Sequence, residues 1–271
     1  MRLQALAGMV AVAAALSHAQ DAQPPKVTSL DVKARGSKTF YVDSAAGRNQ
    51  VAIFSESTLE DFTIVCNEVS GEWQFNPQNV EQIKGKFSVK VEDLRTGIEL
   101  RDHHLVSPDW LDAAKYPLIV VNIERAEDVK KTAANSVTMT MVGKCSLHGA
   151  THDVRIKTAL TFLDETPKTM ERVKGDLIRL RADFQVKLSD YGVHGPVGSD
   201  TVGLKVAETL PIKASVFGST DRPHAPLKVD KPGTATMPAA ASTQPAEVAT
   251  RPAPAQGPAI LRPPTRSPSG Q

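Results

Sequence analysis

The sequence predicts an all-β domain between residues 38 and 219. Apolar residues occupy every second position in most of this stretch, a pattern typical of antiparallel strands with one buried and one exposed face. Helical spacing fits only two short places, residues 107–115 and the segment before residue 38. The apolar faces must be buried together, in a closed barrel or in a two-sheet sandwich. Because the strands are long and follow one another directly, we expect an up-and-down barrel of about eight strands.

The strands are expected in the following order. Residues 50–57 and 62–75 are rich in β-forming residues but alternate less regularly. Residues 86–94 place Phe87, Val89 and Val91 on one face. Alternation is clearest in four later segments, whose apolar faces carry Val137, Met139, Met141, Cys145 and Leu147 (136–149), Val154, Ile156, Leu160 and Phe162 (152–163), Ile178, Leu180, Phe184, Val186 and Leu188 (176–192), and Val202, Leu204, Val206, Leu210, Ile212 and Val216 (201–217).

One short helix is expected over residues 107–115. Ser107 is a good N-cap residue, Pro108 suits the first helical position, and Asp109 suits the first turn. The preceding residues, up to His104, are then expected to end a strand.

The two ends of the chain differ in composition from this domain. Residues 1–19 combine a basic start, an apolar run and small residues before a cleavage point, which predicts a secretory signal peptide and a periplasmic or secreted protein. This apolar run is too short to span a bilayer comfortably and no later one is longer, so an integral membrane protein is not expected. Residues 20–37 are expected to be a linker, and the proline-rich residues 220–271 a disordered tail.

Four motifs resemble those of the YceI-like family and occur in the same order. They are VSGEWQF (69–75), LRTGIELRDHHLVSPDWLDAAKYPLI (94–119), CSLHGATHDV (145–154) and DFQVKLSDYGV (183–193). The resemblance implies a lipocalin-like antiparallel β-barrel that is exported and binds a long apolar molecule in its lumen. The implied ligand is a polyisoprenoid, or another long-chain lipid such as a fatty acid. The family is not known for enzymatic activity.

An eight-stranded barrel either fills itself with side chains or encloses one small ligand, and the composition leaves both alternatives open. If the lumen holds a ligand, the strand faces predict which residues line it. These candidates are Phe87, Val89, Val91, Met139, Met141, Ile156, Leu160, Leu180, Phe184, Val186, Leu204 and Val206.

Four polar residues near the barrel ends have two interpretations. In the structural one, Arg101 and Asp102 hold the connection before the helix through charge-assisted hydrogen bonds, and His104 bonds to the backbone. In the other, Arg101 or His104 contacts the polar head group of a ligand at the barrel mouth. His148 lies in a β-turn and belongs to the same set of candidates. Because the histidines lack the spacing of a zinc site, we expect neither a metal site nor a cofactor.

Two cysteines, Cys66 and Cys145, both lie on the apolar faces of their strands. An oxidising compartment favours a disulfide between them. Their strands are not neighbours in a simple meander, however, and a disulfide needs close Cα atoms. A disulfide and two separate buried thiols therefore stay open.

The function expected from these features is that of an exported, non-enzymatic lipid-binding protein. One alternative is an envelope interaction module acting through the proline-rich tail, and a weaker one is a barrel-mouth hydrolase using His104 and His148. The net charge of +2 and the lack of clustered basic residues argue against nucleic-acid binding. A homodimer is left open.

Overall fold

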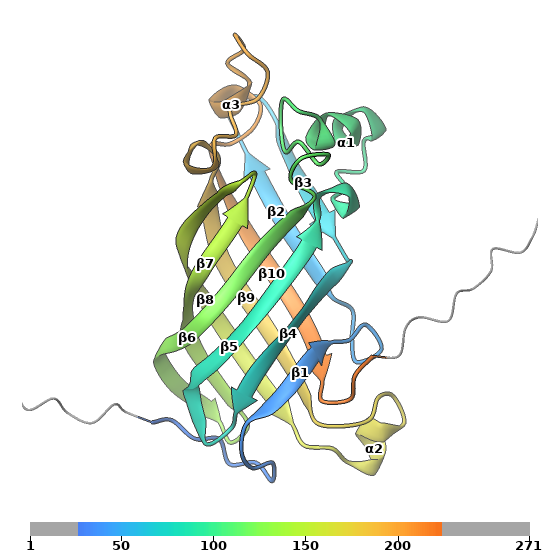
Figure 1. Ribbon diagram of the computed structural model, residues 1–271, viewed down its shortest axis with the longest axis vertical. Coiled ribbons are helices and arrows are strands. Elements are labelled where there is room, and N and C mark those ends of the chain that lie inside the picture. The colour runs from blue at the N-terminus through green and yellow to red at the C-terminus, as the bar shows by residue number, and fades with distance from the viewer. Residues whose placement is uncertain (1–26, 224–271) are drawn as a thin grey trace, which may run out of the picture. The chain divides into compact units, whose positions relative to one another are not determined.

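The computed structural model describes residues 27–223 of the 271-residue chain. The expected signal peptide (1–19) and nearly all of the expected tail (220–271) lie outside these residues and stay predictions. Within them, strands form one antiparallel sheet that closes on itself (Figure 1). The strands are β1 (Lys38–Val42), β2 (Gln50–Glu56), β3 (Asp61–Cys66), β4 (Val69–Asn76), β5 (Asn79–Lys90), β6 (Leu118–Ala133), β7 (Ser136–Leu147), β8 (Ala150–Leu163), β9 (Leu177–Lys187) and β10 (Thr209–Ser219).

The ring closes through β1, which pairs with β4 on one side and with the end of β10 on the other. From β4 to β10 each strand pairs with the next one in the chain. The hairpin of β2 and β3 continues the sheet beside β10, where Ile212 lies opposite Ile53. This arrangement is a closed eight-stranded up-and-down barrel with the β2–β3 hairpin extending one end, so the predicted fold class is confirmed.

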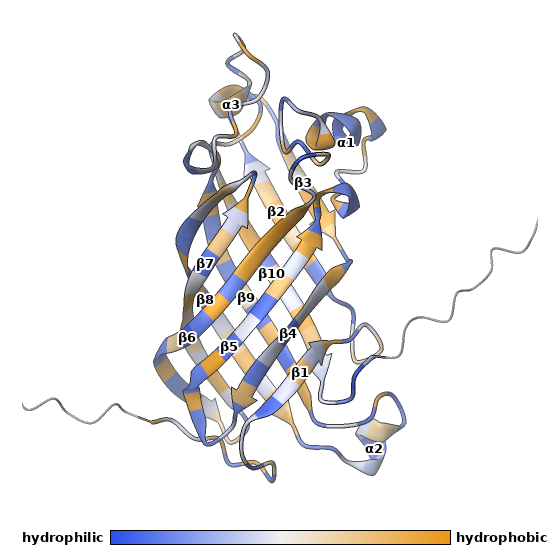
Figure 2. Cartoon of the chain, in the orientation of Figure 1, coloured by the Kyte–Doolittle hydropathy of each residue, from blue (hydrophilic) through white to orange (hydrophobic). Residues whose placement is uncertain are grey.

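The predicted alternation is present in the strands that the sequence marks most clearly. In β7, every second residue from Val137 to Leu147 is buried, and the residues between them are exposed or half-buried. Figure 2 shows the same alternation of hydrophobic and hydrophilic residues along the strands of the barrel wall. The apolar side chains therefore point into the barrel.

The longest helix, α1, spans Glu99–Val106, so the prediction of a helix over 107–115 is wrong. Ser107 ends α1 instead of starting a helix, because its backbone N–H and its hydroxyl both donate to the His104 carbonyl, at 3.0 and 2.6 Å. Residues 108–115 form turns in which Asp112 donates back to the Ser107 carbonyl. Single-turn helices α2 (Pro167–Met170) and α3 (Thr201–Leu204) and 3-10 turns at Val91–Asp93 and Leu188–Tyr191 complete the described elements.

The strand expected from residue 201 begins only at Thr209. Gly203 has φ +95° and donates its N–H to the Val206 carbonyl at 2.7 Å, so the chain turns back on itself there. A positive φ of this kind suits glycine and breaks an extended strand. The alternation of Val202, Leu204 and Val206 therefore belongs to α3 and the loop after it.

Residues 27–37, which fall within the expected linker, pack against the lower end of the barrel. Leu30 and Val32 are buried, and backbone N–H groups of Leu30 and Asp31 donate to the carbonyls of Pro77 and Ala134, both at 2.7 Å. This part of the segment thus covers the barrel end opposite α1 (Figure 1). Over the range 27–223, no helix has the length and apolar character needed to cross a membrane.

Candidate functional site

The lower end of the barrel interior is filled by an aromatic floor, which consists of Phe40, Trp73, Phe75 and Phe162. All four are almost completely buried. The ring of Phe40 stacks on Trp73 with centroids 5.8 Å apart and meets Phe162 edge-on at 6.0 Å. Phe75 stacks on Phe162 at 6.1 Å. Aromatic side chains bury large areas and pack best in such offset and edge-on arrangements, so the floor closes this end with a solid core.

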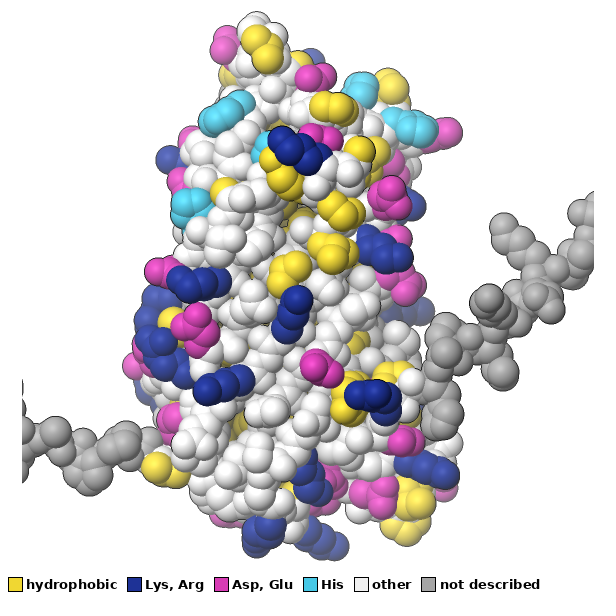
Figure 3. All heavy atoms as spheres, in the orientation of Figure 1, with side chains coloured by type: hydrophobic (Ala, Val, Ile, Leu, Met, Phe, Trp, Pro, Cys, Tyr) yellow, Lys and Arg dark blue, Asp and Glu magenta, His cyan; other side chains and the backbone are white. Residues whose placement is uncertain are grey.

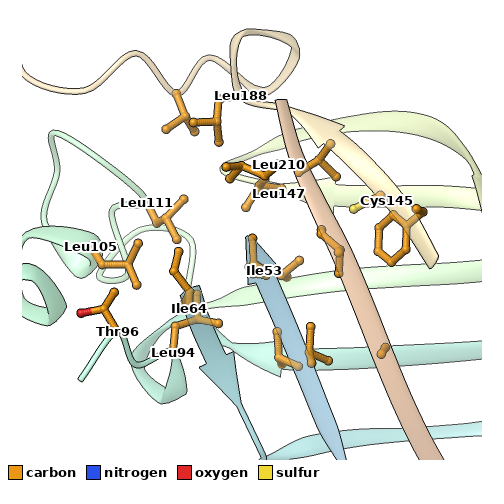
Figure 4. Close-up of a pocket in the computed structure, with 18 of the residues that line it drawn as sticks. Ile53, Ile64, Leu94, Thr96, Leu105, Leu111, Cys145, Leu147, Leu188 and Leu210 are labelled. Atoms are coloured by element: carbon orange, nitrogen blue, oxygen red, sulfur yellow. The ribbon is translucent and has the colours of Figure 1, made fainter. Parts of the chain in front are cut away.

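Between the aromatic floor and α1 the interior holds a cavity of about 560 Å³. This volume lies within the range of small-molecule sites in proteins. Its wall is mostly apolar and comes from strands all around the ring and from the segment between β5 and β6 (Figure 4). Examples from different elements are Ile53 of β2, Ile64 of β3, Leu147 of β7 and Leu210 of β10.

Eight of the twelve residues predicted to line a lumen border this cavity: Phe87, Val89, Met141, Ile156, Leu180, Phe184, Val186 and Val206. Met139 and Leu160 are buried deeper in the barrel and do not line it, and Val91 is buried in a 3-10 turn beyond β5. Leu204 lies in α3 and is 43% exposed. These four residues do not border the cavity. Alternation identifies the inward face of Met139 and Leu160 but not their depth along the barrel, and Val91 and Leu204 lie outside regular strands.

Some of the lining residues that were not predicted from the sequence lie in strands, such as Ile53, Ile64 and Leu210, and others lie outside regular strands. Leu105, Trp110 and Leu111 reach the cavity from α1 and the turns after it, and Leu94 comes from the segment before α1. No period-two pattern marks these positions, since they lie in a helix and in loops. Their signal in the sequence is only that they are apolar residues inside an otherwise polar connection.

Arg101 and Asp102 lie within α1, not at a strand end, and both hold α1 in place. The Arg101 guanidinium pairs with Glu60 in the β2–β3 loop and lies 4.3 Å from the centre of the Phe62 ring. The Asp102 carboxylate accepts hydrogen bonds from the backbone N–H and the hydroxyl of Thr96, both at 2.6 Å. Partial burial raises the pKa of Asp102, but the two hydrogen bonds from Thr96 outweigh it and lower this pKa below its usual value.

The two candidate histidines have different surroundings. His104 lines the cavity mouth, and within residues 27–223 its ring makes no hydrogen bond, contrary to the backbone contact expected for it. His148 does not line the cavity. Its Nδ1 donates to the Tyr191 carbonyl at 3.1 Å, since a carbonyl only accepts, and its ring meets Tyr116 edge-on. His148 therefore supports a turn, while His104 faces the entrance.

Cys66 and Cys145 are both free and buried, so the disulfide alternative is wrong. Cys145 on β7 borders the cavity, whereas Cys66 on β3 does not. Burial raises the pKa of both thiols, which keeps them protonated at neutral pH. Among the side chains of residues 27–223, no group of three or more His, Cys, Asp or Glu is arranged to hold a metal ion.

Two UPF0312 proteins are similar in sequence to this chain. A UPF0312 protein of Pseudomonas fluorescens is 28% identical over 127 residues, which cover 46% of this chain and 63% of that protein. A UPF0312 protein of Pseudomonas putida is 28% identical over 165 residues, which cover 61% of this chain and 73% of that protein. The chain thus matches less than two thirds of the length of the first relative.

Among solved structures, Burkholderia cenocepacia BcnA is 19% identical, with a TM-score of 0.49 over 65% of this chain and 98% of that one. A Saccharophagus degradans domain described as a polyisoprenoid binding domain is 14% identical, with a TM-score of 0.49 over 66% of this chain and 97% of that one. Residues 40–217 match the family model of the YceI-like domain. The chain therefore belongs to the YceI-like family, as its four motifs predict.

Proposed function

We propose that this protein is an exported, non-enzymatic lipid-binding protein that holds a polyisoprenoid or another long-chain lipid in its barrel. The observation that carries the proposal is the apolar cavity of about 560 Å³ above the aromatic floor. Transfer of one CH₂ group from water into such a site contributes about 0.8 kcal/mol. A tail of about ten carbons therefore supplies enough free energy for tight binding without a specific polar contact.

The polar residues near the cavity support binding rather than catalysis. Arg101 is paired with Glu60, Asp102 accepts two hydrogen bonds from Thr96, and His148 is bonded to a backbone carbonyl. These contacts position α1 and a turn. They also occupy Arg101, Asp102 and His148, so these side chains are not free to act on a substrate. His104 lies at the mouth with no hydrogen bond to its ring, where it is available to a polar head group, and Arg101 lies beside it in its pair with Glu60. A tail that enters first would leave its head group beside them.

A pair of alanine variants on adjacent strands tests the proposal. Ala182 of β9 lines the cavity, whereas Ala159 of β8 lies on the opposite parity, between the inward-facing Thr158 and Leu160. We expect Ala182→Phe to fill the cavity and weaken binding of a labelled polyprenol or fatty acid by about tenfold or more. Ala159→Phe should bind like the wild type. Equal binding by the two variants, or no binding by the wild type, would contradict the proposal.

Export rests on residues 1–19, which the structure does not describe. Removal of a signal peptide predicts that the mature chain begins at Gln20. N-terminal sequencing of the protein from a periplasmic or culture fraction measures this directly. A chain that keeps Met1 and stays in the cytoplasmic fraction would rule out the export part of the proposal and leave lipid binding untouched.

A further inference from the structure

Large apolar residues that are exposed to solvent gather around the cavity mouth. Nine such residues are exposed in the part of the chain that the structure describes. Five of them lie in three segments at the upper end of the barrel, which we call the mouth segments: residues 57–60, 96–117 and 188–208. These five are Leu59, Ile98, Leu100, Val197 and Leu204. On the face shown in Figure 3, hydrophobic side chains likewise gather toward this end.

Two of the five residues are linked to each other, and two others border the cavity. The backbone N–H of Leu59 donates to the Leu204 carbonyl at 2.9 Å, which places the β2–β3 loop beside α3. Ile98 and Leu100 border the cavity although more than half of each is exposed to solvent. At Ile98 and Leu100, apolar side chains thus extend from the interior of the barrel to the outside of the mouth, beside polar residues such as Glu60, His104 and Lys205 that also border the cavity.

The charges around this apolar surface are mostly negative. The mouth segments contain three basic residues, Arg101, Lys115 and Lys205, and Arg101 is paired with Glu60. Their eight acidic residues are Glu60, Glu99, Asp102, Asp109, Asp112, Asp190, Asp200 and Glu208. An excess of acidic groups repels an anionic surface, so attraction at this end must come from the apolar side chains.

We propose that the mouth end docks on a lipid bilayer with a neutral surface, with the exposed apolar residues of the mouth segments entering the interface. This inference rests on the proposed function, because a lipid cargo has to pass between a bilayer and the cavity. Single apolar side chains that project from separate loops suit the head-group region of a bilayer, whereas a protein partner usually covers one compact face. The continuous apolar path at Ile98 and Leu100 would spare the lipid tail contact with water during transfer.

Vesicle flotation of the purified full chain tests the proposal, with phosphatidylcholine vesicles as the probe. The test variant combines Leu59→Ser, Val197→Ser and Leu204→Ser, none of which lines the cavity. The control combines Leu163→Ser at the end of β8 and Met170→Ser in α2, two residues about as exposed as Leu204 that lie toward the opposite end of the barrel. We expect the wild type and the control to float with the vesicles and the test variant to bind about tenfold more weakly. Replacing part of the phosphatidylcholine with phosphatidylglycerol should weaken binding at low salt.

Binding of a labelled fatty acid in the cavity is measured on the same samples. Cavity binding without flotation of the wild type would overturn docking and leave the proposed function intact. Flotation without cavity binding would do the reverse. Three other outcomes would overturn the docking proposal. In one, the test and control variants lose vesicle binding equally. In another, the wild type binds anionic vesicles more strongly than neutral ones. In the third, the wild type self-associates without floating, and the test variant abolishes that self-association.

Discussion

The two ends of the barrel interior use the same strand pattern for opposite purposes. At the lower end, the aromatic floor of Phe40, Trp73, Phe75 and Phe162 packs ring against ring and leaves no space. At the upper end, most inward positions carry aliphatic residues, aromatic ones such as Phe87 and Phe184 stand among them, and a cavity of about 560 Å³ remains. Side-chain volume, rather than backbone geometry, decides whether this eight-stranded barrel is solid or hollow.

The comparison assigns a separate role to each end. A residue in the close-packed end contributes more to the free energy of folding than a residue in the hollow end, because each of its buried atoms has neighbours at van der Waals distance. The hollow end gives up such contacts and leaves apolar surface that a lipid tail can cover. Changes at the floor should therefore act on stability, and changes at the cavity wall should act on binding.

The largest expected effect is a loss of stability at the floor. Phe162→Ala removes a fully buried ring that contacts Phe40 and Phe75, and it should lower the free energy of unfolding by about 3–5 kcal/mol. Phe184→Ala removes a ring of the same size from the cavity wall, where it already borders empty space, and should cost about 1–2 kcal/mol. Denaturant unfolding of the ligand-free protein measures both. Equal losses would refute the division of the barrel.

The next effect concerns ligand binding and stability together. A bound lipid at about one hundred times its Kd should raise the free energy of unfolding by about 2.7 kcal/mol. The gain should be the same in Phe162→Ala, which leaves the cavity wall unchanged, and should fall by about half or more in Ala182→Phe. Thermal unfolding with and without added fatty acid measures the three cases. A gain as large in Ala182→Phe as in the wild type would place the ligand elsewhere.

A smaller effect separates the two buried thiols. Cys145 borders the cavity and Cys66 does not, although both are buried and burial raises the pKa of both. A small apolar thiol reagent should therefore label Cys145 through the mouth, more slowly than an exposed cysteine and faster as the pH rises and thiolate forms. Bound lipid should slow this reaction about tenfold and leave Cys66 unreactive. Mass spectrometry of digested protein locates the label, and faster labelling of Cys66 would contradict the placement of the cavity wall.

The smallest effect concerns the contact between Asp102 of α1 and Thr96. Asp102→Asn weakens the two hydrogen bonds from Thr96 and should cost about 1 kcal/mol at neutral pH. Because the pKa of Asp102 is lowered in the folded protein, its carboxylate stabilises the fold above its ordinary pKa and loses this effect as the pH falls through the lowered value. The difference between variant and wild type should therefore begin to shrink below about pH 4 and disappear once the pH lies below the lowered pKa of Asp102. A constant difference down to pH 2 would show that ionisation of Asp102 is not involved.

The sequence predicts the barrel because an alternating strand such as β7 has one apolar and one polar face, a pattern typical of an antiparallel sheet that is buried on one side. The helix was misplaced because Ser107, Pro108 and Asp109 form a good start signal, whereas the N-cap position of α1 is Ile98, whose side chain makes no cap. Likewise, Val202, Leu204 and Val206 alternate, but Gly203 turns the chain. The depth of each inward residue depends on strand register around the ring, and no local pattern encodes that register.

Native mass spectrometry of the purified full chain, without added ligand, tests the central claim most directly. The account predicts a population heavier than the bare polypeptide by the mass of one long-chain lipid, which organic extraction removes and an added prenol or fatty acid restores. Ala159→Phe should keep this population and Ala182→Phe should lose it. If the wild type shows only the bare mass and takes up neither lipid, the cavity is not a lipid site and the account is wrong.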